Sequence, residues 1–147
     1  MVRVLFQKLL VAYPDLAALL LRVGFGFMMS VNHGYVKLMH FHEWKTDFTS
    51  FMGLDGSLSL ALAIFAELVC SIMLVLGLFT RLALVPLLIT MVVIFQAHKW
   101  DLLGEGELAT SFLIGYLAIL AAGPGRYSLD SLLEKRLKNK GGRHQVV

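Results

Sequence analysis

The sequence predicts an all-α fold, a polytopic membrane four-helix bundle with a short interfacial amphipathic helix at each end. Composition is the first reason, since 58% of the 147 residues are hydrophobic and the mean hydropathy is +0.76. A soluble domain is typically about 45–50% apolar, and a short chain cannot bury this excess in one water-soluble core. The second reason is that the apolar residues form long continuous runs, whereas the strands of a membrane barrel alternate apolar and polar residues.

Four apolar runs are long enough to span a bilayer, because a hydrocarbon core about 30 Å thick requires about 20 helical residues. These predicted spans are residues 16–38, 58–78, 82–100 and 107–122. The fourth span is short and begins at Glu107, so we expect it to start close to the membrane interface. The chain therefore divides into an N-terminal interfacial segment, a four-helix transmembrane domain and a basic amphipathic tail, at residues 1–15, 16–123 and 124–147.

Charge placement predicts the orientation and the partners. Nine of the 13 Lys and Arg residues lie before the first span, in the turn between the second and third spans, or in the tail, whereas the other two loops carry only Lys45 and Lys99. Lysine and arginine concentrate on the cytoplasmic side, so we expect both termini there. Apolar residues on one face of both terminal segments indicate helices that bind anionic lipid. No basic stripe is interleaved with aromatic residues, so we predict no nucleic-acid partner.

Six ionisable side chains interrupt the predicted spans, where a charge at the bilayer centre costs about 2.5–3.5 kcal/mol. They are Arg22, His33, Lys37, Glu67, His98 and Glu107. At about 100° per residue, the three charged positions of the first span share one stripe of the helix. The small residues Gly26 and Ser30 lie on the same stripe and allow a neighbouring helix to approach closely. We therefore expect these charges to face other helices rather than lipid.

Depth separates these groups into two layers. At about 1.5 Å per residue, Arg22 lies some 9 Å inside the cytoplasmic boundary and Glu67 lies near mid-membrane. We therefore predict an Arg22–Glu67 ion pair. Its role is either functional or purely structural, as a static link between two helices. The outer layer contains His33, Lys37, His98 and Glu107, with Gln96 as a supporting residue. Histidine titrates near neutral pH, so this layer is either a proton-handling catalytic site or a set of snorkelling interface residues.

The sequence gives weaker support to a metal or haem site. His40 and His42 lack the further ligands that a closed metal site needs. His33 and His98 could ligate a haem across the bundle, but both lie off the midplane among charged neighbours. Cys70 is the single cysteine and lies in an apolar run, so we interpret it as a packing residue. We therefore predict no metal and no built-in cofactor.

Several motifs of the chain resemble the DoxX family of small four-helix bacterial membrane proteins. The matching segments are LLLRVGFG (Leu19–Gly26), HGYVKL (His33–Leu38), AELVCSIMLVLGLFTR (Ala66–Arg81) and GPGRYSLD (Gly123–Asp130), together with His98 and Glu107. The resemblance implies a bundle in the bacterial inner membrane and functional roles at Arg22, His33, Lys37, Glu67, Arg81, His98 and Glu107. Some members of this family are described as subunits of thiosulfate:quinone oxidoreductases or terminal quinol oxidases, and others are tied to oxidative-stress complexes.

Our first functional hypothesis is a membrane oxidoreductase subunit that binds a quinone between its helices and acts with a redox partner carrying a flavin, haem or metal. His33 and Glu107 would exchange protons with the quinone oxygens. Lys37 and His98 would polarise those oxygens. Two alternatives stay open. One is a non-catalytic scaffold or assembly factor, and the other is a small proton-coupled transporter, which would need a homo-oligomer or a helix broken at Pro86.

Overall fold

A computed structural model describes residues 13–51, 53–101 and 103–141, and every regular element in these residues is helical. Three continuous helices are long and apolar enough to cross a membrane: Pro14–Met39, Gly56–Leu76 and Thr80–Ala97. A fourth apolar helix, α8 (Glu107–Ala122), is shorter, with 16 residues. The all-α membrane fold predicted from the sequence is therefore confirmed. Most of the predicted N-terminal interfacial segment lies outside the described residues.

The first two long helices each contain a π-helical segment. The first helix consists of α2 (Pro14–Met29), η1 (Ser30–Tyr35) and α3 (Val36–Met39), and the short α4 (Phe41–Trp44) follows it. The second helix consists of α5 (Gly56–Ile64), η2 (Phe65–Cys70) and α6 (Ser71–Leu76). The third is α7 (Thr80–Ala97). A π segment widens the helical turn locally and occurs frequently at functional sites, so these two segments direct attention to the residues inside them.

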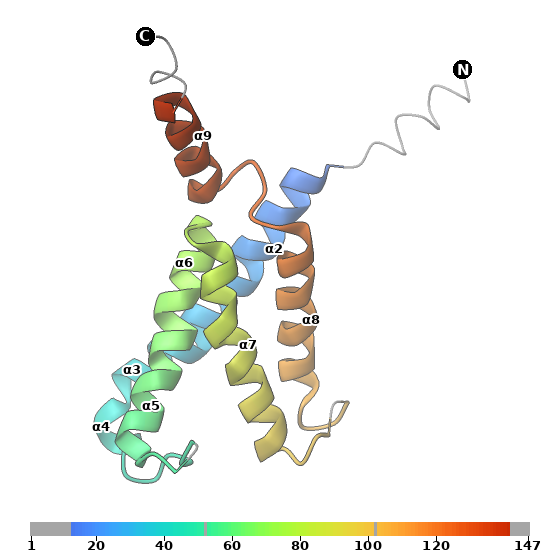
Figure 1. The fold of residues 1–147 in the computed structure, drawn as a ribbon. Helices are drawn as coiled ribbons and strands as arrows, with labels where there is room; N and C mark the ends of the chain where they lie inside the picture. The colour runs from blue at the N-terminus through green and yellow to red at the C-terminus, as the bar shows by residue number, and fades with distance from the viewer. Residues whose placement is uncertain (1–12, 52, 102, 142–147) are drawn as a thin grey trace, which may run out of the picture.

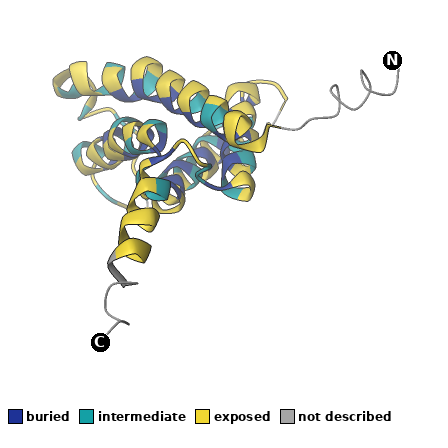
Figure 2. Cartoon of the chain, turned by 90° about the horizontal axis from the view of Figure 1, so that it is seen from above, coloured by how far each residue is buried: buried dark blue, intermediate teal, exposed yellow. Residues whose placement is uncertain are grey.

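The four apolar helices form a bundle, and α9 (Leu129–Gly141) leaves it beyond the end of α8 (Figure 1). α2 packs against α6 and α8, η1 packs against η2, and α7 packs against α8, η2 and α6. The buried faces of the helices point toward one another and the exposed faces point outward (Figure 2). The outward faces carry large apolar residues such as Leu82, Val85 and Ile114, as expected for helices that contact acyl chains.

Local signals set the ends of the helices. Pro14 occupies the first turn of α2, where its missing N–H is not needed. The second span stops before its predicted end because Gly77 adopts a left-handed conformation at φ +65° and closes the helix. The third span ends at Ala97 rather than residue 100, because Lys99 and Trp100 also have positive φ. The fourth span has the predicted bounds.

The helices α5 and α7 diverge as they run away from the α6–α7 turn (Figure 1). α7 packs against α6 and η2, so the separation grows beyond η2. Pro86 lies inside α7, and a proline removes one backbone hydrogen bond from a helix. The Thr90 hydroxyl donates a hydrogen bond to the Pro86 carbonyl oxygen at 3.0 Å, on the same stretch of α7. This divergence creates the space in which the candidate site lies.

Candidate functional site

The backbones of the two π segments pack unusually close to each other. Gly34 lies in η1 and Glu67 lies in η2. A Cβ atom added to Gly34 would lie 2.6 Å from the carbonyl carbon of Glu67 and 2.6 Å from the Leu68 nitrogen. Real side chains do not tolerate such contacts with backbone, so only glycine fits at this position. The close approach fixes the register of the first helix against the second and places the next turn of the first helix above Glu67.

A buried ion pair forms on this contact. Lys37 Nζ donates to Glu67 Oε2 at 2.5 Å, and the two side chains are 18% and 2% exposed. The charges of both groups also act on the imidazole of His33, which lies in η1. A buried charge without a partner is costly, and the loss of one partner of such a pair costs about 3–5 kcal/mol in soluble proteins. Lys37 therefore makes an ionised Glu67 tolerable at membrane depth.

The predicted Arg22–Glu67 ion pair is wrong, although both side chains are buried. Arg22 is 0% exposed, and its guanidinium donates to backbone carbonyl oxygens. Its partners are Leu74 O at 3.3 Å, Val75 O at 3.3 Å and Tyr127 O at 2.7 Å. The carbonyl oxygens at the end of α6 carry negative partial charge, so they attract a cation. Because Gly34 lies against Glu67, Arg22 is twelve residues, or about 18 Å of helix, away from that carboxylate.

The predicted outer layer of His33, Lys37, His98 and Glu107 is not gathered into one site. Lys37 is paired with Glu67, and the His33 ring packs edge-to-face against Phe112 with centroids 5.7 Å apart. His98 lies beyond the end of α7 because the helix stops at Ala97, and its Nδ1 is 3.4 Å from Glu105 Oε2. The remaining predicted members, Gln96 and Glu107, are exposed. Of the predicted supporting residues, Ser30 is buried but donates only to Phe27 O within its own helix, and Arg81 is exposed.

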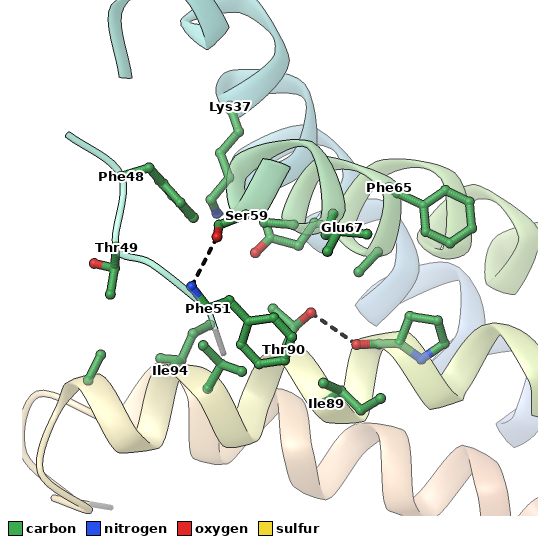
Figure 3. A pocket seen from close by; sticks show the side chains of 16 residues that line it. Lys37, Phe48, Thr49, Phe51, Ser59, Phe65, Glu67, Ile89, Thr90 and Ile94 are labelled. Carbon is green, nitrogen blue, oxygen red and sulfur yellow. Dashed lines mark hydrogen bonds and ion pairs between the residues drawn. The ribbon is translucent and has the colours of Figure 1, made fainter. Parts of the chain in front are cut away.

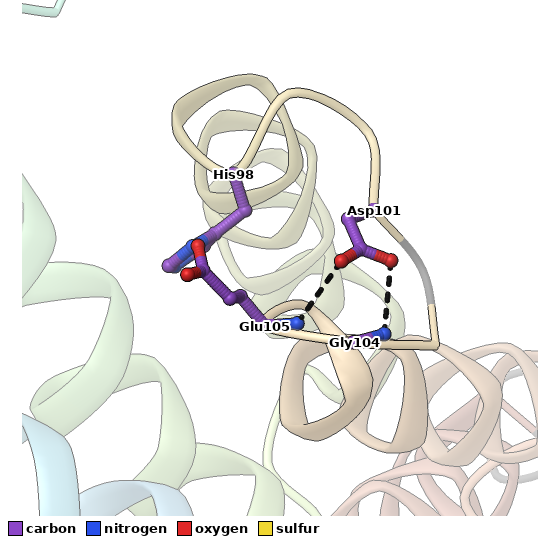
Figure 4. A network of polar contacts seen from close by, with 4 residues as sticks. All are labelled: His98, Asp101, Gly104 and Glu105. Atoms are coloured by element: carbon purple, nitrogen blue, oxygen red, sulfur yellow. Dashed lines mark hydrogen bonds and ion pairs between the residues drawn. The ribbon is translucent and has the colours of Figure 1, made fainter.

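The loop that holds His98 is organised by Asp101 (Figure 4). Asp101 accepts hydrogen bonds from Gly104 N at 2.9 Å and Glu105 N at 3.3 Å. These backbone hydrogen bonds, helped by the nearby His98, hold the pKa of Asp101 below its usual value. The polar groups at this end of the bundle therefore order the loop between α7 and α8 and do not reach the Lys37–Glu67 pair. Within the residues that the structure describes, no group of three or more His, Cys, Asp and Glu side chains is arranged to hold a metal.

A cavity of about 470 Å³ lies between the diverging helices α5 and α7 (Figure 3). Its walls are mainly apolar, and the Lys37–Glu67 pair lies on one side of it. The lining residues are Lys37, Phe48, Thr49, Phe51, Ser59, Leu62, Ala63, Phe65, Ala66, Glu67, Pro86, Ile89, Thr90, Val93, Ile94 and Ala97. Small-molecule sites typically have volumes of about 300–1,000 Å³, mostly apolar walls and a few placed polar groups. The cavity matches that description.

The cavity has two different boundaries. The loop between α4 and α5 lies at one end, and the lipid-facing surface of the bundle lies along the flank. Phe51 N donates to the Ser59 hydroxyl at 3.0 Å, which holds the loop against α5 at the end of the cavity. On the flank, the lining residues Leu62, Phe65 and Ile89 are each about half exposed on the outer surface of the bundle. That surface is apolar and faces acyl chains. The arrangement favours access from the bilayer, between α5 and α7, over access from water.

Sequence reasoning missed most of the cavity residues and the contacts of the GPGRYSLD motif. Asp130 accepts hydrogen bonds from Phe79 N at 2.7 Å and Thr80 N at 2.9 Å, and its own N–H donates to Gly77 O at 2.9 Å. The first turn of α9 thus caps α7 and is tied to the α6–α7 turn. The motif was recognised as a whole, but the role of Asp130 as a cap supplied from a distant segment had no local signal. Ser59 and the α7 lining were missed because nothing in the sequence showed that α5 and α7 diverge.

The fold and the site define a polytopic helical membrane protein with a lateral cavity beside a buried ion pair. The DoxX family model matches residues 17–100, which is more than half of the chain. The chain belongs to the DoxX family. The matched region includes Lys37, Glu67 and the α7 wall of the cavity, and it ends before Glu107.

One relative was found among curated proteins. The membrane protein Rv3486 of Mycobacterium tuberculosis is 36% identical over an alignment of 110 positions, and the alignment covers 65% of this chain and 63% of that protein. The match therefore spans less than two thirds of the length of the relative. No solved structure matches the chain.

Proposed function

We propose that this protein is the membrane subunit of a quinone-linked oxidoreductase and that it binds the quinone in the cavity between α5 and α7. One observation carries the proposal: a mainly apolar cavity of about 470 Å³, flanked by lipid-facing residues, has a partly buried lysine and a buried carboxylate in its wall. A quinone has the matching character, with an apolar ring and tail and two polar oxygens.

The chemistry assigns a role to each member of the ion pair. A lysine ammonium has three N–H donors, and one of them is used by Glu67, so the others can donate to a quinone carbonyl oxygen. Glu67 can accept the hydroxyl proton of a quinol or return a proton to the reduced quinone. The Ser59 hydroxyl on α5 and the Thr90 hydroxyl on α7 offer further polar contacts in the cavity. His33 would influence the pair through its charge, and Glu107 has no part in this revised site.

Electrons would come from or go to a partner protein. Conversion of a quinone to a quinol takes two electrons and two protons, and the residues described above handle only the protons. A partner carrying a flavin, haem or metal centre would exchange the electrons. We place the protein in the bacterial inner membrane with both termini in the cytoplasm, because lysine and arginine are concentrated at the termini and at the α6–α7 turn. The tail, residues 124–147, would then lie on the cytoplasmic surface, and self-association of the bundle is compatible with this arrangement.

A non-catalytic scaffold role is the second candidate, and α9 favours it. The helix is fixed to the bundle at Asp130, yet Leu132 and Leu137 farther along it are exposed and apolar. Such a surface could organise a redox complex even if the cavity carried only lipid.

Photolabelling with an azido derivative of decylubiquinone tests the proposed function. The full chain in lipid nanodiscs should be labelled on the α5–η2 and α7 segments that line the cavity, and unlabelled decylubiquinone should compete. The double variant Lys37→Gln/Glu67→Gln removes both charges together and should weaken competition by about 10-fold or more, the effect of losing about 1.4 kcal/mol of polar contacts. The matched control is Lys99→Gln/Glu105→Gln, which changes the same residue types in the exposed loop. Labelling outside the cavity, or equal competition in both double variants, would refute quinone binding at this site and leave the scaffold role.

A further inference from the structure

Buried polar atoms without partners gather in one half of the bundle. In the described part of the chain, four buried side-chain atoms have no hydrogen-bond partner. They are Arg22 Nε, Ser71 Oγ, Thr80 Oγ1 and Tyr116 Oη. Each of these four residues is at most 1% exposed. A buried polar group without a hydrogen bond costs free energy, and native interiors usually satisfy such groups with protein or ordered water.

These four groups lie along the bundle between Glu67 and the α6–α7 turn. Ser71 lies four residues after Glu67 on the second helix, which is about 6 Å along its axis. Tyr116 on α8 lies at the same level along the bundle. Its hydroxyl is beside Ser71 Oγ but outside hydrogen-bonding geometry, and the charge of Glu67 acts on it. Arg22 is bonded to Leu74 O and Val75 O, about one turn beyond Ser71.

The packing of the first helix shows that these levels lie along one interface. Gly34 is against the Glu67 backbone, and a Cβ on Gly26 would lie 3.0 Å from Ser71 O. Glu67, Ser71 and the Arg22 carbonyl partners therefore follow one face of the second helix. Thr80 opens α7 at the end of this line, where Asp130 is hydrogen bonded to its N–H and offsets the charge of Arg22.

We propose that Ser71, Tyr116 and Thr80, completed by ordered water, form a proton path between Glu67 and the α6–α7 turn. A proton arriving at the turn would pass to water beside Thr80. At Ser71 and Tyr116 each hydroxyl would accept a proton on one side and release its own on the other, so that a proton reaches the Glu67 carboxylate with no net change in the relay. The inference rests on the proposed function, because it supplies the proton that Glu67 exchanges with the bound quinone.

Other titratable groups also face Glu67 and have to be separated from this path. Lys37 faces it from α3 as its ion-pair partner, and His33 acts on it from η1. The described residues of α7 that line the cavity contribute the Thr90 hydroxyl but no charged side chain. His33 is therefore the competing proton donor, and its ring packs against Phe112 of α8. His33→Gln should leave the proton path intact.

Infrared spectroscopy after a pH jump measures proton arrival at Glu67 directly. The full chain in nanodiscs is shifted from alkaline to acidic pH, and the protonated-carboxyl band of Glu67 is assigned by its loss in Glu67→Gln. Ser71→Ala and Tyr116→Phe should each slow the appearance of this band by about 100-fold, a typical contribution of a positioned proton-transfer group, without changing its final size. The matched controls are Ser30→Ala, a buried serine satisfied within its own helix, and Tyr35→Phe, an exposed tyrosine. Both controls should keep the rate of the unmodified protein.

Thermal unfolding of the same variants provides the second measurement. Hydroxyls that hold ordered water stabilise the fold, so their removal should lower the Tm. Hydroxyls that are merely orphaned destabilise it, so their removal should raise the Tm. Rates equal to the controls, a raised Tm in Ser71→Ala and Tyr116→Phe, or the absence of a titrating Glu67 would overturn the path. Decylubiquinone competition is measured in the same nanodiscs, so that failure of the path with intact binding is distinguished from failure of the proposed function.

Discussion

Replacement of Gly34 by alanine should disrupt the contact that holds the candidate site together. The new Cβ would lie 2.6 Å from Glu67 backbone atoms, whereas ordinary van der Waals contact begins at 3.4 Å. The two π segments would therefore have to separate by about 0.8 Å. Neither side can yield cheaply because the clash is with backbone. Overpacking of this kind costs about 1–3 kcal/mol, and we expect Gly34→Ala to lower the unfolding free energy by that amount.

Gly24 provides a matched control on the same helix. A Cβ at Gly24 would meet nothing within 4 Å, so Gly24→Ala introduces the same chemical change without the clash. Alanine has the higher helix propensity, by about 1 kcal/mol in water, so Gly24→Ala should be neutral or stabilising. Unfolding of both variants in detergent micelles, followed by circular dichroism, gives the comparison. Equal stability of the two variants would show that the π segments do not contact each other through Gly34.

Three further predictions concern the polar contacts. Lys37→Met should destabilise the protein by about 3–5 kcal/mol, because it leaves Glu67 buried without a counter-charge, and the double variant Lys37→Met/Glu67→Leu should recover most of the loss; unfolding titrations of both would show whether the pair is coupled. Asp130→Ala should cost about 0.5–2 kcal/mol by uncapping α7, and thermal unfolding should show this as a lower Tm. A Tm equal to that of the unmodified protein would show that the cap is unimportant. The lowered pKa of Asp101 implies that its contribution to the α7–α8 loop is complete above its usual value of 3.8 and is lost as the pH falls through the lower folded-state pKa. Amide exchange at Gly104, corrected for the intrinsic pH dependence, should then accelerate only in that acidic window, and acceleration near neutral pH would contradict the assignment.

The positions of the helices could be predicted from the sequence because each apolar run is a local property. The fourth span, residues 107–122, has the predicted bounds, and the stripe of charged and small residues correctly placed Arg22 on a buried face. The error at the end of the third span has a local cause. Lys99 and Trp100 adopt left-handed backbone conformations, which neither composition nor hydropathy indicates for these residue types.

The pairing of the buried charges could not be predicted, because it depends on register between helices. Depth estimates counted from the ends of separate spans placed Arg22 within reach of Glu67. The actual register is set by a glycine contact between two π segments, which brings Lys37 to Glu67 and leaves Arg22 at the end of α6. Ser59, Thr90 and the other cavity residues were missed for a related reason, since a cavity arises from the angle between helices and not from the pattern along either one.

Because the cavity opens sideways toward the lipid, the ligand concentration that matters for this protein is the concentration in the bilayer. A molecule that enters between α5 and α7, past Leu62 and Ile89, is drawn from a two-dimensional solvent, so occupancy follows its mole fraction among the lipids. The length of the ligand's apolar tail then affects binding in two ways. It changes the fit in the cavity, and it changes partitioning of the ligand into the bilayer, which gains about 0.8 kcal/mol for each buried methylene. Short-tailed, water-soluble analogues will therefore look weak in any titration scaled to the aqueous phase, even where their head groups are recognised equally well.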